Sequence, residues 1–369
     1  MTDLILTLLA TLVVIVILAG ILAPLETLRW WGGMAAPEDA ASEPLDSSTD
    51  EDSAHPHYVV YLSGIGSVSG DELVPAEVPF LRALEEAMPD ARLLLDVFPY
   101  SATNNGLTGQ RLLAGAFRWV SARRWEKTSV TELLINLRNA FQVAVSADER
   151  YGPVFNFATA RVIRDKLLEH GYRPGRGRRV ALIGYSGGAQ IAIGATPFLE
   201  ELIGAPVRVI SLGGVMTGDN GIIDTEHLYH IYSDIDELEK FGSVAFPGRW
   251  PIYTNSGWNT ALRTGKATLI LLPGMTHTLA KSYMDPDTVQ PDGRTNLETT
   301  VALIANLIRS DKVGEREPGS LSRAQLADLV RRVAADRPET AEAIVRLLDE
   351  NGLEIQSRVA QAAIEERRS

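Results

Sequence analysis

The chain has 369 residues, with 35 Lys and Arg side chains against 47 Asp and Glu, so its net charge is −12. Hydrophobic residues make up 45% of the chain and charged residues 22%, which supports a sizeable core and excludes a disordered chain. The acidic composition argues against a nucleic-acid binder, whose affinity rests on Lys and Arg. The absence of cysteine excludes disulfides, thiolate metal sites and a cysteine nucleophile.

The N-terminal segment predicts a membrane anchor. From Leu4 to Ala23 the chain carries only Leu, Ile, Val, Ala, Thr and one Gly, and a helix of that length spans roughly 30 Å, about the thickness of a bilayer core. A cleaved signal peptide is the alternative, but the three preceding residues lack its positive charge. We therefore expect residues 1–24 to be a single-pass transmembrane anchor. Arg29, the nearby basic residue, weakly favours a cytoplasmic body.

Two further stretches lie outside the expected sheet domain. Residues 25–56 hold many Asp, Glu, Ser and Ala residues, which predicts a flexible acidic linker. Residues 313–369 place Leu326, Leu329 and Val333 at helical spacing, which predicts a C-terminal helical segment appended to the domain. Neither stretch identifies a protein partner.

Residues 57–312 alternate short β-branched runs with longer amphipathic ones. This pattern predicts an α/β domain, with a mostly parallel sheet and helices on both faces. The predicted strands are residues 58–62, 92–98, 179–185, 207–212, 227–232 and 267–272. The predicted helices are residues 76–88, 130–142, 155–171, 189–203 and 296–308. Residues 100–152 interrupt the rhythm, so we expect an insertion or lid there.

A serine lies in the turn between one predicted strand and the next helix. The sequence Gly184-Tyr185-Ser186-Gly187-Gly188 is a G-x-S-x-G motif in its strand–turn–helix context. Such a turn exposes the serine oxygen and leaves the N–H of Gly187 to face an oxyanion. Ser186 is therefore the expected nucleophile. The alternative is a glycine-rich crossover without chemistry.

A nucleophilic serine needs a base and an acid that orients the base. Of the six histidines, His277 follows the last predicted strand in a turn, where a mobile imidazole can reach the serine. Asp236 follows the strand at 227–232 and is the preferred acid, with Asp234 as its competitor. We expect the unused aspartate to be a turn or capping residue.

The loop after the first predicted strand is the second candidate for oxyanion binding. Gly64 and Ile65 lie there, and a glycine lets a backbone N–H approach a substrate closely. The alternative is that the glycines only form a tight turn.

Loop glycines, G-x-S-x-G and the order Ser186, Asp236, His277 resemble the α/β-hydrolase superfamily over about residues 58–309. The resemblance implies a nucleophile after the fifth strand, an acid after the seventh and a histidine after the eighth. It also implies an oxyanion hole formed by the N–H groups of Gly187 and Ile65, with no metal or organic cofactor. Ser63 stands where the family usually has histidine.

The resemblance implies a serine hydrolase that works through an acyl-enzyme, and thioesterases and peptidases share this constellation. The expected membrane tether favours a small-molecule or lipid ester as the substrate. A dinucleotide-dependent oxidoreductase is a rival, because glycines at 64, 66 and 70 follow a strand. Pro75 and Pro79 delay the helix that such a site needs, and the chain has no Tyr-x-x-x-Lys. The second rival is a membrane-anchored, non-catalytic hydrolase-like binding or scaffold protein.

Overall fold

The computed structural model describes residues 56–104, 106, 129–174, 178–218 and 221–310, together with residues 342, 345, 346 and 361. The chain divides into two compact units, Met1–Val313 and Gly314–Ser369. The predicted anchor, nearly all of the linker and nearly all of the C-terminal segment lie outside the described residues. Among the helices that are described, none has both the length and the apolar character needed to cross a bilayer.

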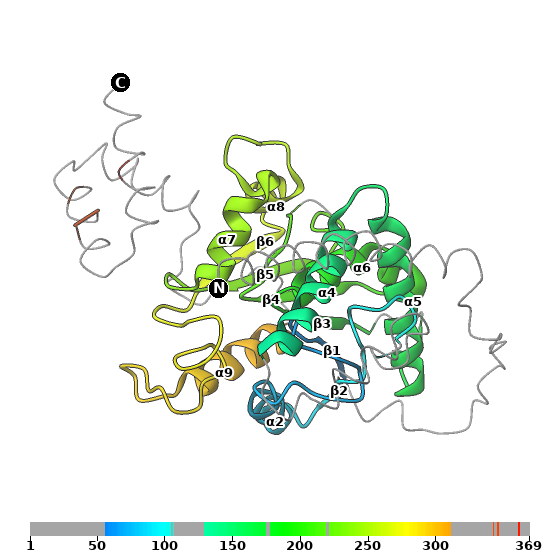
Figure 1. Ribbon diagram of the computed structural model, residues 1–369, viewed down its shortest axis with the longest axis horizontal. Coiled ribbons are helices and arrows are strands. Elements are labelled where there is room, and N and C mark those ends of the chain that lie inside the picture. The colour runs from blue at the N-terminus through cyan, green and yellow to red at the C-terminus, as the bar shows by residue number, and fades with distance from the viewer. Residues whose placement is uncertain are drawn as a thin grey trace, which may run out of the picture. The chain divides into compact units, whose positions relative to one another are not determined.

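Six strands of the first unit form one parallel sheet (Figure 1). Their order is β2-β1-β3-β4-β5-β6, and every neighbouring pair is parallel, which confirms the predicted sheet. The strands are β1 (His57–Leu62), β2 (Ala91–Leu94), β3 (Val180–Tyr185), β4 (Val207–Leu212), β5 (His227–Tyr232) and β6 (Ala267–Leu271). Because β2 and β3 flank β1 on opposite sides, the strand order reverses between β1 and β3. Parallel sheets bind ligands at the carboxyl ends of strands beside such a switch point.

The second strand is shorter than predicted. It ends at Leu94, whereas the apolar run suggested an end at Phe98. The side chain of Asn104 accepts from the Phe98 amide at 2.6 Å and donates to the Asp96 carbonyl at 3.0 Å. These backbone groups therefore bond to a loop side chain instead of continuing the ladder with β1.

Helices cover both faces of the sheet, as predicted (Figure 1). One layer holds α4 (Ser129–Ala147), α5 (Gly152–Glu169) and α6 (Gly188–Ile203), and the other holds α2 (Val78–Ala87) and α9 (Asn296–Arg309). Strand β1 shows the alternation that two cores require. Val60 and Leu62 belong to the core under α4, α5 and α6. Val59 and Tyr61 belong to the core under α2 and α9.

One helix of the expected 100–152 insertion packs into the body of the domain. Helix α4 packs on α5 and α6, and its side chains Ile135, Val143 and Val145 are buried in the core. This helix therefore belongs to the body of the domain. Residues 105 and 107–128, the rest of the expected lid, lie outside the described residues.

Between β5 and β6 the structure contains three helices that the sequence pattern did not predict: α7 (Glu237–Ala245), the 3-10 helix η4 (Pro247–Arg249) and α8 (Gly257–Thr264). Helix α7 exposes apolar side chains, Phe241 at 64% and Val244 at 68%. A helix whose apolar residues face outward gives no inward-facing pattern to recognise.

Candidate active site

Ser186 lies on a sharp turn between β3 and α6. Its φ is 54°, in the left-handed region that costs a residue with a Cβ about 1–2 kcal/mol. Glycines on either side permit the turn. A Cβ on Gly184 would lie 2.5 Å from Cα of Ala189, and one on Gly188 would lie 2.3 Å from the carbonyl oxygen of Leu62. The G-x-S-x-G pattern is thus required by backbone contact at both glycines.

The structure brings Ser186, His277 and Asp236 together. Oγ of Ser186 lies 2.8 Å from Nε2 of His277. Nδ1 of the same imidazole lies 2.8 Å from Oδ2 and 3.1 Å from Oδ1 of Asp236. All three side chains are buried, and they follow β3, β6 and β5 at the carboxyl edge of the sheet. This geometry suits a nucleophile, a base and an orienting acid.

The two aspartates after β5 have different partners. Asp236 is the N-cap of α7 and accepts from the amides of Leu238 and Glu239 at 3.0 and 3.1 Å. Its carboxylate is therefore fixed by the helix start while it contacts the imidazole. Asp234 instead accepts from the Gly274 amide at 2.7 Å, which holds the turn that leads to His277. Of Asp236 and Asp234, the two candidates from the sequence, it is Asp236 that contacts the imidazole of His277.

Two tyrosines support this arrangement, and sequence reasoning assigned no role to either. The hydroxyl of Tyr283 donates to Oδ2 of Asp236 at 2.9 Å. The hydroxyl of Tyr185 donates to the carbonyl of His277 at 2.6 Å, and its ring stacks on the imidazole. Burial raises the pKa of both tyrosines far above the ordinary value, so the hydroxyls remain donors. Tyr185 is the variable residue of the motif before Ser186, whereas no local signal marked Tyr283.

The predicted oxyanion donors need one correction. The amide of Gly64 donates to Oε1 of Glu77 at 3.2 Å and is therefore occupied. The amides of Ile65 and Gly187 have no acceptor among the described residues. The two loops lie side by side, because a Cβ on Gly187 would be 2.9 Å from Cγ2 of Ile65. Of the three predicted donors, Gly187 and Ile65 stay available.

A buried charged cluster lies behind the acid. Oε1 of Glu239 lies 3.0 Å from Nε2 of His230 and 2.7 Å from a guanidinium nitrogen of Arg249. Burial alone would raise the pKa of Glu239, but His230 and Arg249 outweigh it and lower that pKa to about 2. Burial lowers the pKa of His230. The backbone amide of Glu239 also donates to Asp236. The cluster therefore holds the start of α7, where Asp236 is the N-cap.

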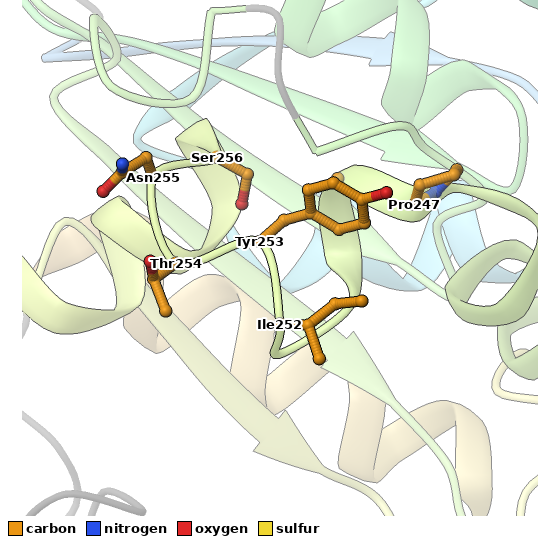
Figure 2. A pocket seen from close by; sticks show the side chains of 7 residues that line it. Pro247, Ile252, Tyr253, Thr254, Asn255 and Ser256 are labelled. Atoms are coloured by element: carbon orange, nitrogen blue, oxygen red, sulfur yellow. The ribbon is translucent and has the colours of Figure 1, made fainter.

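The structure also contains a hollow that is lined by none of Ser186, His277 and Asp236 (Figure 2). It has a volume of about 540 Å³ and is lined by Pro247, Gly248 and residues 252–256. No histidine, aspartate or glutamate lines it, so it offers no base to activate a nucleophile. No group of three or more metal-ligating side chains occurs in the part of the chain that the structure describes.

No protein-family model matches the chain, and no curated protein matches it. One solved structure that matches is a single-residue variant of SOBER1 from Arabidopsis thaliana. It is 14% identical, the match covers 68% of this chain and 98% of that chain, and the TM-score is 0.34. The functional assignment therefore rests on the side-chain geometry of Ser186, His277 and Asp236.

Proposed function

We propose that this chain is a serine hydrolase that cleaves an acyl ester through an acyl-enzyme. The observation that carries the proposal is the continuous path from Oγ of Ser186 through the imidazole of His277 to the carboxylate of Asp236. The left-handed backbone of Ser186 adds support, because strained residues of this kind gather at functional sites.

Acylation follows from the positions of these atoms. Oγ of Ser186 attacks the ester carbonyl while Nε2 of His277 takes its proton, and Asp236 stabilises the imidazolium that forms. The carbonyl oxygen becomes an oxyanion that accepts hydrogen bonds from the amides of Gly187 and Ile65. When the tetrahedral intermediate collapses, the carbon–oxygen bond breaks and the imidazolium returns its proton to the leaving alcohol.

Deacylation uses the same groups in reverse. Nε2 of His277 takes a proton from water, whose oxygen attacks the acyl carbon held by Ser186. The oxyanion forms again at the same two amides. Collapse breaks the bond to Oγ, and the proton on the imidazolium passes to the serine. The carboxylic acid leaves and the free enzyme is restored.

The surroundings favour an apolar acyl group. Val143 and Ile65 approach Gly187 closely, since a Cβ at that glycine would lie 2.8 and 2.9 Å from their methyl groups. Leu279, two residues after the catalytic histidine, is 88% exposed. Phe241, on the helix that Asp236 caps, is 64% exposed. We therefore propose a lipid or other long-chain acyl ester as the substrate class.

The decisive experiment is labelling of the full chain with a fluorophosphonate, which requires an activated serine. We expect wild type to be labelled at Ser186, and the Ser186→Ala variant to take no label. Ser211, which is buried and lies beside His230, provides the matched control, because Ser211→Ala should still be labelled. A folded wild type without label would favour the non-catalytic binding protein instead.

Substrate class is tested with p-nitrophenyl esters of increasing acyl length, together with matched thioesters. The proposal expects kcat/KM to rise with chain length, because each buried methylene contributes about 0.8 kcal/mol. Equal rates on acetate and long-chain esters would remove the support for a lipid substrate. A strong preference for thioesters would mean that the natural leaving group is a thiol instead of an alcohol.

The membrane anchor is a proposal as well, supported by the uncharged run from Leu4 to Ala23. We expect the full chain to stay with membranes after alkaline carbonate extraction, whereas Leu12→Arg combined with Val13→Arg should release it. Protease protection in sealed vesicles then reports the side on which the domain lies, for which Arg29 favours the cytoplasm. Release of the unmodified chain by carbonate would contradict the anchor.

A further inference from the structure

The loop that follows β1, residues 63–67, is held from several directions. The side chains that hold it are buried and come from three separate segments: Glu77, Tyr100 and Asn139. The Tyr100 hydroxyl donates to the Ser63 carbonyl at 2.8 Å. Nδ2 of Asn139, on α4, donates to the carbonyl of Ile65 at 2.7 Å. We call residues 63–67 the oxyanion loop, because they include the Ile65 amide.

Glu77 is unlike the other two side chains because it can carry a charge. Only 3% of the residue is exposed. Its Oε1 accepts from the amide of Gly64, while Oε2 has no hydrogen-bond partner among the described residues. The titratable groups that face it are Tyr61 of β1, Tyr185 of β3 and Tyr100 of the segment after β2. No cation pairs with it within the described part of the chain.

A buried carboxyl without a cation is costly, so its presence needs a reason. Helix capping is not the reason, because Glu77 is the N-cap residue of α2 but its side chain makes no capping bond. Packing alone would be served better by an apolar residue. The hydrogen bond to the Gly64 amide, next to Ile65, ties this carboxyl to the backbone of the oxyanion loop.

We propose that Glu77 is a positioning residue that holds the oxyanion loop through the Gly64 amide, so that the next amide, that of Ile65, faces the oxyanion formed at Ser186. The role rests on the serine hydrolase function proposed above. Glu77 itself touches neither the substrate nor the reacting atoms. It fixes the loop from the α2 side, while Asn139 fixes it from the α4 side.

Because Glu77 can ionise, its role should depend on pH. Burial raises the pKa of Glu77 to about 7, against smaller lowering effects of Gly64, Ser63 and Tyr61. Above that pH the ionised carboxylate adds a negative charge beside the loop that must stabilise an oxyanion, which opposes the reaction. Glutamine keeps the acceptor oxygen without the charge. Leucine removes both and leaves the Gly64 amide unpaired.

The test measures the second-order rate of fluorophosphonate labelling of Ser186 in the full chain and its Glu77→Gln and Glu77→Leu variants. We expect Glu77→Leu to react about tenfold more slowly or worse, which corresponds to about 1.4 kcal/mol, and Glu77→Gln to restore the rate. The ratio of the Gln rate to the wild-type rate should be near one at about pH 6 and should rise at least about threefold by about pH 8.5. Glu85→Gln and Glu85→Leu, on the exposed face of the same helix, serve as matched controls and should react like wild type.

The outcomes separate the two proposals. A wild type that takes no label overturns both the hydrolase function and the role of Glu77. A labelled wild type with an equally fast, folded Glu77→Leu variant overturns the role of Glu77 alone. A Gln variant that is as slow as the Leu variant, or a rate ratio that stays flat or falls with pH, also overturns it. Thermal unfolding of each variant excludes loss of the fold as the cause of a slow rate.

Discussion

The ring of Tyr185 stacks on the imidazole of His277, with centroids 5.3 Å apart and planes inclined by 20°, while its hydroxyl donates to the backbone carbonyl of the same histidine at 2.6 Å. One side chain therefore fixes both the ring and the backbone of the proposed base. Because Tyr185 ends β3 and immediately precedes Ser186, adjacent residues position the proposed nucleophile and the proposed base.

Tyr185→Phe should separate these two contributions. The variant keeps the stacked ring but loses the hydrogen bond to the His277 carbonyl, a net contribution of about 1 kcal/mol. We expect kcat/KM on a short p-nitrophenyl ester to fall about fivefold, with a smaller change in KM than in kcat.

Tyr172→Phe is the matched control, because it also removes a tyrosine hydroxyl that donates to a backbone carbonyl, that of Arg178 at 3.1 Å. The control should lose stability to a similar extent but keep its activity. Equal loss of activity in both variants would show that Tyr185 supports only the fold.

Asp236→Asn and Asp234→Asn should differ sharply. An asparagine at 236 still caps α7, because its carbonyl oxygen accepts from the same amides. It cannot hold the imidazole of His277 as a carboxylate does, so we expect kcat to fall by about a thousandfold or more.

An asparagine at 234 keeps the acceptor for the Gly274 amide, so kcat should change by less than about threefold. Steady-state kinetics on one ester at one pH compare the two variants directly. Similar losses at positions 234 and 236 would mean that the carboxylate beside His277 has no special role.

The parallel sheet and the three-residue constellation were predictable because their signals are local. Strands β1 and β4 contain pairs of valines or valine and isoleucine in short apolar runs, and β4 and β5 have the predicted limits. Ser186 was marked by glycines that backbone contacts require. His277 and Asp236 were found because each follows a strand, and the carboxyl ends of parallel strands meet at one edge of the sheet.

The groups that hold the site were not predictable, because their partners are distant in sequence. Asn139 lies 74 residues from Ile65 and Tyr283 lies 47 residues from Asp236. No spacing rule connects such pairs. The same limit explains why the Gly64 amide was wrongly expected to bind the oxyanion. Its hydrogen bond to Glu77 depends on how the segment before α2 folds back, which no local pattern indicates.

The left-handed backbone at Ser186 predicts an inversion of the usual preference for alanine over glycine. With φ at 54°, alanine bears the Cβ strain of about 1–2 kcal/mol and glycine does not. We therefore expect the free energy of unfolding of Ser186→Gly to exceed that of Ser186→Ala by about 1 kcal/mol, as measured by denaturant unfolding. Neither variant should be active.

Ser243, inside α7, provides the control. In a helix interior glycine is about 1 kcal/mol less favourable than alanine, so Ser243→Gly should be less stable than Ser243→Ala. The expected signs are opposite at the two positions. The same order at both would argue that the turn at Ser186 relaxes without strain.

Acid should unfold the domain through the charged cluster of Glu239, His230 and Arg249. The fold holds the pKa of Glu239 at about 2, below its ordinary 4.5, so its contribution is complete above about 4.5 and is lost as the pH falls towards 2. The fold also lowers the pKa of His230 from its ordinary 6.5, so the unfolded chain binds a proton first. In both cases the unfolded state binds more protons, and the free energy of unfolding must fall as the pH decreases.

Glu239→Gln removes the carboxylate from this cluster and with it the buried ion pair between Glu239 and the guanidinium of Arg249. We expect the variant to lose about 3–5 kcal/mol at neutral pH and to show a shallower decline in stability between about pH 4.5 and pH 2. Glu237→Gln, which removes an exposed ion pair with Lys240, should cost less than about 1 kcal/mol. Denaturant unfolding across this pH range tests the argument. Parallel stability curves for Glu239→Gln and wild type would mean that Glu239 titrates alike in the folded and unfolded chains, and that the cluster does not govern acid stability.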